Sequence, residues 1–457
     1  MKKEITFGQS IGIVVVLLGL IFASLFLLGL APHVPLLISI VALCTIGALM
    51  GGKWKTFEHG IVEGIKVGVK PILILMLVGV LIAAWMVGGT IPTILSYGFN
   101  WISPRYFLIS ALLITILVSS FTGSTFTTIS TVGVALFGIG TAIGVNPGLA
   151  AGIIVSGAVF GDKMSPLSDT TNFASGIVGV SLSDHIRHML WTTLPSIIVT
   201  AVIALVIGIS THRTGVNYGD IEAVQSVLGD TFNLNLLTLL SPLVVLILSI
   251  KRFDVLPTLV IGIIIAVITG VLLQPTVTLG SMLGALQSGG QIDSGNEIVN
   301  AIVTKGGLDS MMFSVSLVII ALALGGLMRE LGVVQALIEG LAKQVRRSGD
   351  VVFSTVLSSI GVNVITGEQY LSILLPGQTF KPLYVKWNLQ EKNLSRTLED
   401  GGTVINPLIP WGVSGAFISQ TLGVPVVDYL PFAFFCLLCP IFAVILGYTG
   451  LGIAKQK

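Results

Sequence analysis

The chain has 457 residues, of which 53% are hydrophobic and 10% are charged, and its formal net charge is +2. Because a soluble globular protein carries about 25% charged residues, this composition excludes that class and predicts a polytopic membrane protein. Cys44, Cys436 and Cys439 lie in apolar runs, and no histidine accompanies the last two. We therefore expect these cysteines to pack in the interior rather than to bind zinc or form a redox pair.

Apolar runs long enough to cross a bilayer alternate with polar connectors, since a helix needs about 20 residues to span the hydrocarbon core. The first run follows a basic start but is too long for a signal peptide, so we expect a retained span. The spans predicted in the first half of the chain are 11–30, 36–50, 71–87 and 191–209. The spans predicted in the second half are 236–250, 256–273, 311–328 and 430–447.

Two connectors carry charged residues between these spans. Residues 56–70 form an amphipathic pattern, and residues 181–190 include His185 and His188. We expect residues 181–190 to lie at the membrane surface and residues 56–70 to form an amphipathic connector.

Two stretches, 106–140 and 351–380, turn from apolar to hydroxyl-rich and back again. This pattern is typical of a re-entrant hairpin whose polar tip stops inside the membrane, where it is shielded from lipid by protein. The candidate tip residues are Thr122, Ser124 and Thr125 in the first hairpin, and Asn363, Thr366 and Glu368 in the second.

Residues 161–172 read Gly-Asp-Lys-Met-Ser-Pro-Leu-Ser-Asp-Thr-Thr-Asn and lie between two apolar segments. An ionisable group at membrane depth costs at least ~2.5 kcal/mol, so three of them indicate a function. Pro166 removes a helix donor and disfavours helical geometry at Ser165, so this span should break. A second broken span is predicted around Asn406-Pro407-Leu408-Ile409-Pro410-Trp411, with Thr403 and Asn406 as its candidate site residues.

We expect Asp162 and Asp169 to hold sodium and protons in turn. Sodium prefers several hard oxygen ligands, which carboxylates, hydroxyls and the carbonyls freed at a helix break supply. A carboxyl group that takes either a proton or a cation performs antiport by competition. The further candidate ligands are Ser165, Ser168, Thr170, Thr171 and Asn172.

Each of these assignments has a structural alternative. Asp169 is also suited to cap the second half-helix, and Asp162 to neutralise Lys163, which we interpret as a structural counter-charge. The hydroxyl groups are equally suited to bonding the broken backbone. Asp400 is a weaker candidate, because Arg396 and Glu399 nearby indicate an ion-pair cluster at the membrane surface.

The order of elements repeats along the chain, which predicts two repeats with a boundary between residues 1–233 and 234–457. Each half has three spans, a re-entrant hairpin, a broken span and a closing span, and Gly325-Gly326 stands where Gly88-Gly89 stands in the first half. Five crossings per half invert the second repeat. The predicted fold is therefore an all-α polytopic membrane protein of two inverted repeats.

The distribution of basic residues supports this topology. With the N-terminus in the cytoplasm, 19 of the 23 Lys and Arg residues lie inside, three lie outside, and Lys163 lies in the membrane. Cytoplasmic loops carry such an excess, so we expect both termini to be cytoplasmic.

The twelve residues 161–172 resemble the signature of the NhaC-type sodium/proton antiporter family within the ion transporter superfamily, and the resemblance covers nearly the whole chain. It implies a secondary active Na⁺/H⁺ antiporter of the cell membrane, a homodimer that works by alternating access without a cofactor. It leaves open a Na⁺- and H⁺-coupled exchanger of small carboxylates such as malate or lactate. The expected partners are sodium, protons and the lipid bilayer, with no nucleic acid.

Two other classes fit the sequence less well. An intramembrane hydrolase needs a base beside a nucleophile, and the five histidines all fall in predicted connectors. An ion channel needs an open pore, whereas paired broken segments favour alternating access.

Overall fold

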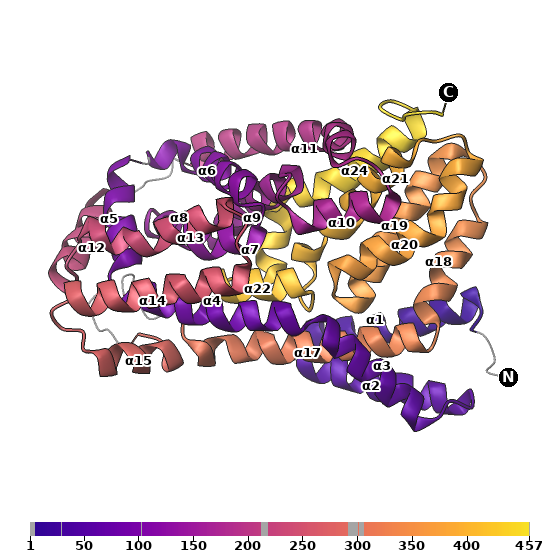
Figure 1. Ribbon diagram of the computed structural model, residues 1–457, viewed down its shortest axis with the longest axis horizontal. Helices are drawn as coiled ribbons and strands as arrows, with labels where there is room; N and C mark the ends of the chain where they lie inside the picture. Colours follow the sequence, from indigo (N-terminus) through magenta and orange to yellow (C-terminus); the bar gives the residue numbers. More distant parts are fainter. Residues whose placement is uncertain are drawn as a thin grey trace.

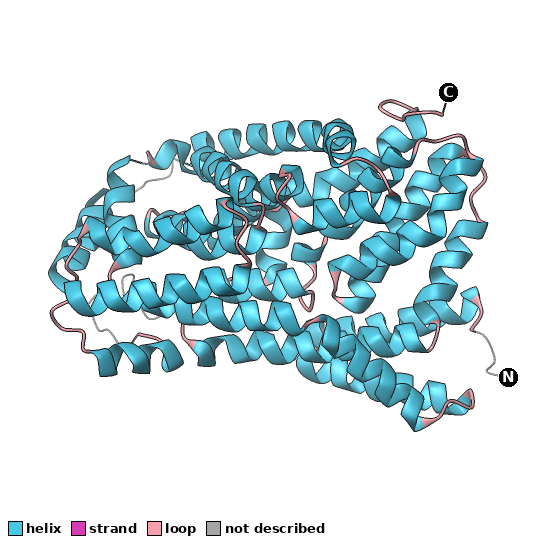
Figure 2. Ribbon diagram, in the orientation of Figure 1, coloured by secondary structure: helices cyan, strands magenta, loops and turns pink. Residues whose placement is uncertain are grey.

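The computed structural model describes residues 5–28, 30–101, 103–211, 218–290, 300 and 306–456. Within these ranges the chain folds into helices joined by short loops, and strand pairing is limited to an isolated bridge between Leu389 and Lys455 (Figure 2). Eight of the described helices are long and apolar enough to cross a membrane, or up to ten if each of two bent helix pairs forms one span. The prediction of an all-α protein with many spans is confirmed, and the inverted repeat and its boundary stay predictions.

The helices of the first half end in a long membrane-spanning helix, α11. They are α1 (Phe7–Phe26), α2 (His33–Leu49), α3 (Trp54–Val67), α4 (Val69–Val87), α5 (Thr90–Trp101), α6 (Phe107–Thr122), α7 (Thr125–Thr128), α8 (Val134–Ala142), α9 (Pro147–Met164), α10 (Asp169–Val178) and α11 (Leu182–Thr211).

The helices of the second half follow a similar order. They are α12 (Tyr218–Thr231), α13 (Leu240–Ile250), α14 (Val255–Leu273), α15 (Leu279–Ser288), α17 (Leu308–Glu330), α18 (Val333–Lys343), α19 (Ser348–Thr366), α20 (Gln369–Lys386), α21 (Glu391–Leu398), α22 (Val413–Leu422), α23 (Val426–Tyr429) and α24 (Phe434–Thr449).

The predicted connector 56–70 contains a full helix, α3, that packs closely along α17. A Cβ atom added at Gly64 would lie 2.2 Å from the Leu322 carbonyl oxygen, so only glycine allows this approach. Gly326 faces Gly64 from inside α17. The sequence match between Gly325-Gly326 and the glycine pair that ends α4 is therefore wrong, because the later pair closes a helix contact and does not end a helix.

The two predicted hairpins are present and enter the molecule from opposite ends, with their tips near its middle (Figure 1). The first hairpin consists of α6 and a returning arm made of α7 and α8, which a short π-helix at Ile129–Gly133 joins to each other. The second hairpin consists of α19 and α20. Gly123 and Gly367 turn the two tips with φ of +63° and +67°, a conformation that favours glycine. The next residue caps the returning helix in each case, since Ser124 accepts from Thr127 N–H and Glu368 from Leu371 N–H.

Both predicted broken helices are also observed. The first runs as α9, ends at Met164, and resumes as α10 after a four-residue break. The second runs as α21, continues as a π-helix over Glu399–Thr403 and a 3₁₀ turn over Asn406–Leu408, and resumes as α22. Proline at 166 and 407 accounts for the breaks, because it cannot donate a backbone hydrogen bond.

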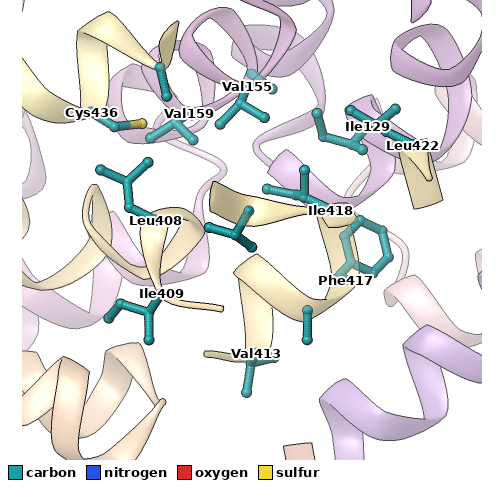
Figure 3. Packing of buried hydrophobic residues seen from close by; sticks show 14 of the residues in the cluster. Ile129, Val155, Val159, Leu408, Ile409, Val413, Phe417, Ile418, Leu422 and Cys436 are labelled. Carbon is teal, nitrogen blue, oxygen red and sulfur yellow. The ribbon is translucent and has the colours of Figure 1, made fainter. Parts of the chain in front are cut away.

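A shared apolar core joins the two broken helices. Val155 and Val159 of α9 and Phe417 and Ile418 of α22 are buried in the same cluster (Figure 3). In a bilayer such side chains associate by van der Waals packing and not by leaving water, and this packing joins the segments from the two halves at their centre.

Candidate functional site

The tip of the first hairpin meets the end of α9 at Asp162. The backbone N–H and hydroxyl of Thr125 donate to Asp162 Oδ2 at 3.0 and 2.7 Å. Gly123 allows this approach, since a Cβ atom there would lie 2.6 Å from the Leu167 carbonyl carbon. Asp162 Oδ1 is buried and has no hydrogen-bond partner. One carboxylate oxygen is thus fixed by the protein while the other is left over for a ligand.

A cavity of about 540 Å³ lies at this meeting point. Six of the predicted site residues line it: Thr122, Ser124, Asp162, Asp169, Asn172 and Glu368. They come from the first hairpin tip, the first break and the second hairpin tip, so the fold brings together segments more than 200 residues apart. The cavity is also lined by Lys70, Arg252, Asp254 and Tyr370, which sequence reasoning did not single out as site residues.

Asp169 faces Tyr370 across the cavity. The Tyr370 hydroxyl donates to Asp169 Oδ2 at 2.6 Å, and the Tyr370 ring packs edge-on against Phe173 with centroids 5.2 Å apart. Ser168, not Asp169, is the N-cap of α10, and its hydroxyl accepts from Thr171 N–H. The interpretation of Asp169 as the cap is therefore wrong, and its carboxylate is exposed towards the cavity.

The predicted hydroxyl ligands of the first break bond mainly to the protein. Ser165 donates to the Ser120 carbonyl at 2.7 Å, and Thr171 donates to the Lys163 carbonyl at 3.0 Å. Thr170 pairs with Ser168 at 3.1 Å. These bonds hold the break against the first hairpin, and a role of these groups in ion binding stays a prediction.

The second break closes on itself through Asn406. Its amide group donates to Asn363 Oδ1 at 2.6 Å and to the Gly367 carbonyl at 3.1 Å, and its Oδ1 accepts from Ser414 N–H at 2.8 Å. Thr366 donates back to the Val362 carbonyl, within its own helix. These predicted site residues join the tip to the break but do not line the cavity, and their part in transport stays a prediction.

The charges predicted at the membrane surface near the second break are buried instead. Arg396, Glu399 and Asp400 are fully buried, and Lys163 Nζ donates to Asp400 Oδ1 at 2.5 Å. The surface prediction fails because the partner of Asp400 lies 237 residues away in the chain, where no local pattern reveals it. Thr403 belongs to the same π-helix and is also buried.

The predicted surface position of residues 181–190 is also wrong. It forms the start of α11, and His185 and His188 are buried against Ser395 and Asn393. A local charge pattern cannot distinguish such a helix end from a surface loop, because the covering element comes from the other half of the chain.

The cavity offers oxygen ligands suited to a small hard cation. Carboxylate and hydroxyl oxygens surround it, and the C-terminal end of α9 directs the negative end of its dipole towards Asp162. Among the described residues, no group of three or more His, Cys, Asp or Glu side chains is arranged to hold a metal ion. The carboxylate and hydroxyl groups that line the cavity are of the kinds that hold sodium in transporters.

Comparison with known proteins gives consistent matches. A family model described as the Na⁺/H⁺ antiporter family matches residues 157–451. The Na⁺/H⁺ antiporter NhaC of Alkalihalophilus pseudofirmus is 51% identical over 457 residues, which cover 100% of this chain and 98% of that protein. The NhaC protein of Bacillus subtilis is 48% identical, over 98% of this chain and 99% of its own.

A relative with another printed activity also aligns along the whole chain. The malate-2H⁺/Na⁺-lactate antiporter of Bacillus subtilis is 32% identical, over 98% of this chain and 96% of its own.

Proposed function

The chain belongs to the Na⁺/H⁺ antiporter family, and we propose that it exchanges sodium for protons at Asp162. Like its relatives, it is a secondary antiporter and not an enzyme. The observation that carries the site is the unpartnered Asp162 Oδ1, buried where the hairpin tip meets the helix break. A buried carboxylate oxygen without a donor is costly unless a cation or a proton occupies it.

Sodium at this site supplies the positive charge that a proton supplies when the ion is absent, so the two ions compete for the same buried negative charge. Thr125 fixes Oδ2 in place, so the ion binds on the Oδ1 side, where Thr122 and Ser124 add hydroxyl oxygens from the tip. Asp169 lies on the open side of the cavity and attracts cations towards it. The ions are transported substrates, and the proposal includes no resident cofactor.

The cavity faces the side that the charge distribution assigns to the cytoplasm. Lys70 and Arg252, both counted among the cytoplasmic basic residues, line its mouth. The start of α1 and the end of α24 lie towards the same end of the molecule, as a cytoplasmic position for both requires (Figure 1). The proposal places this multi-pass protein in the cell membrane as a homodimer, and chemical cross-linking in native membranes tests the oligomeric state.

Proton flux in proteoliposomes tests the proposed exchange. We expect sodium alone to drive proton movement in the parent protein, and Asp162→Asn to abolish it. Asp184→Asn is the matched control, because Asp184 is exposed at the start of α11 and does not line the cavity. Full flux in Asp162→Asn would place the ion elsewhere, and absence of flux in the parent would contradict the antiport function.

A second candidate function is the coupled exchange of a small carboxylate. The cavity is much larger than a sodium ion needs, and Arg252 lines it as a basic residue, whereas Lys70 is paired with Asp254 at 3.8 Å. Adding malate or lactate to the same assay separates the two functions. Flux that requires the carboxylate favours this second candidate, and flux that is complete without it favours simple Na⁺/H⁺ antiport.

A further inference from the structure

A second buried polar centre begins one residue after Asp162. Lys163 Nζ donates to Asp400 Oδ1, which also accepts from the Thr192 hydroxyl at 3.0 Å and from Cys439 Sγ at 3.2 Å. The partners come from α9, α11, α24 and the second broken helix. This centre therefore joins the two halves of the chain directly behind the proposed sodium site.

Glu399, next to Asp400, is the unexplained member of this centre. Its side chain is fully buried, and neither carboxylate oxygen has a hydrogen-bond partner. The π-helix that carries it packs tightly, since a Cβ atom at Gly401 would lie 2.9 Å from the Val356 carbonyl oxygen. Short π-helical segments are frequent at functional sites. No described hydrogen bond reaches a carboxylate in this position, so its burial is costly unless a proton or a nearby cation neutralises it.

The charges of the centre balance only if one more positive charge is present. Lys163 and Arg396 are the buried cations, and Asp162, Glu399 and Asp400 are the acids. The charges of Lys163, Asp162 and Asp400 all act on the Glu399 carboxyl group. Either a proton on Glu399 or a sodium ion on Asp162 brings the net charge of the five groups to zero. Both together would leave a net positive charge.

The other titratable groups packed around the centre do not alter this count. His185 and His188 of α11 pair with Ser395 and Asn393, and neither bonds to a carboxylate among the described contacts. Cys439 of α24 and Tyr384 of α20 are neutral side chains in the interior. Asp169 and Glu368 lie across the cavity, where the Tyr370 hydroxyl and Leu371 N–H donate to them.

We propose that Glu399 carries the proton that is exchanged for the sodium ion at Asp162. This inference rests on the proposed function and assigns the two ions to two neighbouring carboxylates rather than to one. When sodium binds Asp162, the Glu399 carboxyl O–H bond breaks and the proton leaves to the solution that the cavity faces. When sodium leaves on the other side of the membrane, Glu399 takes a proton from the solution there.

The test compares two fluxes of Glu399→Gln and the parent in proteoliposomes at saturating sodium. Glutamine keeps the shape of protonated glutamate but cannot release a proton. We expect sodium-driven proton flux to fall to the background of empty liposomes. We expect exchange of radioactive sodium for unlabelled sodium, which needs no proton, to continue. Coupled proton flux equal to that of the parent would overturn the inference.

Equal loss of both fluxes in Glu399→Gln would overturn it too, because the residue would then serve sodium binding or folding. Glu399→Asp keeps a titratable group and should retain coupled flux, with its pH profile shifted by about 0.4 unit to lower pH, the difference between the ordinary pKa values of the two acids. A Glu399→Asp protein as uncoupled as Glu399→Gln contradicts the proposal. Failure of the proposed function itself is distinct, since it appears as absent flux in the parent or as undiminished flux in Asp162→Asn.

Discussion

The two hairpin tips turn in the same way, at Thr122-Gly123-Ser124 and Thr366-Gly367-Glu368. The broken helices that meet these tips differ, however, in the hydrogen bonds that their polar groups make. At the first break, Thr125 bonds one oxygen of Asp162 and leaves the other buried without a partner. At the second, Asn406 bonds two acceptors and one donor. Where the breaks meet the tips, the first therefore keeps a carboxylate oxygen for an ion, whereas the Asn406 amide of the second is used to join the tip to the break.

The largest effect on stability is expected from Asn406→Asp. This change places an acid between Thr403 and Gly412, where the second break has none. An aspartate loses both amide donors and places an unpaired charge in the interior, so unfolding free energy should fall by at least about 3 kcal/mol. No second sodium site should appear. Thermal unfolding followed by tryptophan fluorescence measures the loss.

Asn146→Asp is the matched control for that change, because Asn146 is exposed and its Oδ1 accepts from Leu149 N–H, a bond that an aspartate keeps. Its unfolding temperature should stay close to that of the parent. An Asn406→Asp protein that is stable and binds two sodium ions would show that the acid alone distinguishes the two breaks.

The two tip glycines sharpen the comparison at the level of the backbone. Alanine at either position should lower the free energy of unfolding by about 1–2 kcal/mol, because the backbone there is left-handed. Gly123→Ala should cost more than Gly367→Ala, because its Cβ atom would lie 2.6 Å from Leu167 backbone, against 3.1 Å from the Trp411 carbonyl oxygen for the other. Unfolding temperatures of the two variants test this order, and the reverse order would contradict the described tip geometry.

Tyr370→Phe tests the contact by which the second hairpin reaches the first break. Loss of the hydroxyl removes the donor that orients the Asp169 carboxylate and should weaken sodium binding by about 1 kcal/mol, a roughly fivefold rise in the KM for sodium. The unfolding temperature should change little, since the ring still packs on Phe173. Sodium-dependent flux measured over a range of concentrations gives the KM, and an unchanged KM would exclude Asp169 from the path of the ion.

The smallest effect on sodium transport is expected from Ser165→Ala. Its hydroxyl donates to the Ser120 carbonyl, so removal should lower the unfolding free energy by about 1 kcal/mol and leave the KM for sodium unchanged. A KM raised as much as in Tyr370→Phe would instead make Ser165 an ion ligand, as the sequence predicts.

Local sequence features predict the parts of the site that local chemistry determines. Pro166 and Pro407 identify the helix breaks because proline removes a backbone donor wherever it occurs. Gly123 and Gly367 follow hydroxyl-rich stretches that predict the hairpin tips. The polar character of these segments within apolar surroundings likewise predicts that they lie together inside the membrane.

Contacts between distant segments are not predictable in this way. Tyr370 and Asp169 are 201 residues apart, and Lys163 and Asp400 are 237 residues apart. The charge cluster around Asp400 therefore resembles a surface ion pair in the sequence, although the fold buries it completely. The π-helix at Glu399 has no separate signal either, because its hydrophobic period differs little from that of an α-helix over five residues.

Equilibrium binding of radioactive sodium to the purified protein tests the central claim most directly, because it requires neither a membrane nor a proton gradient. The parent and Asp184→Asn should bind sodium equally, and Asp162→Asn should bind none above background while keeping the parent's unfolding temperature. Undiminished binding by Asp162→Asn would contradict the assignment of the sodium site to the first helix break.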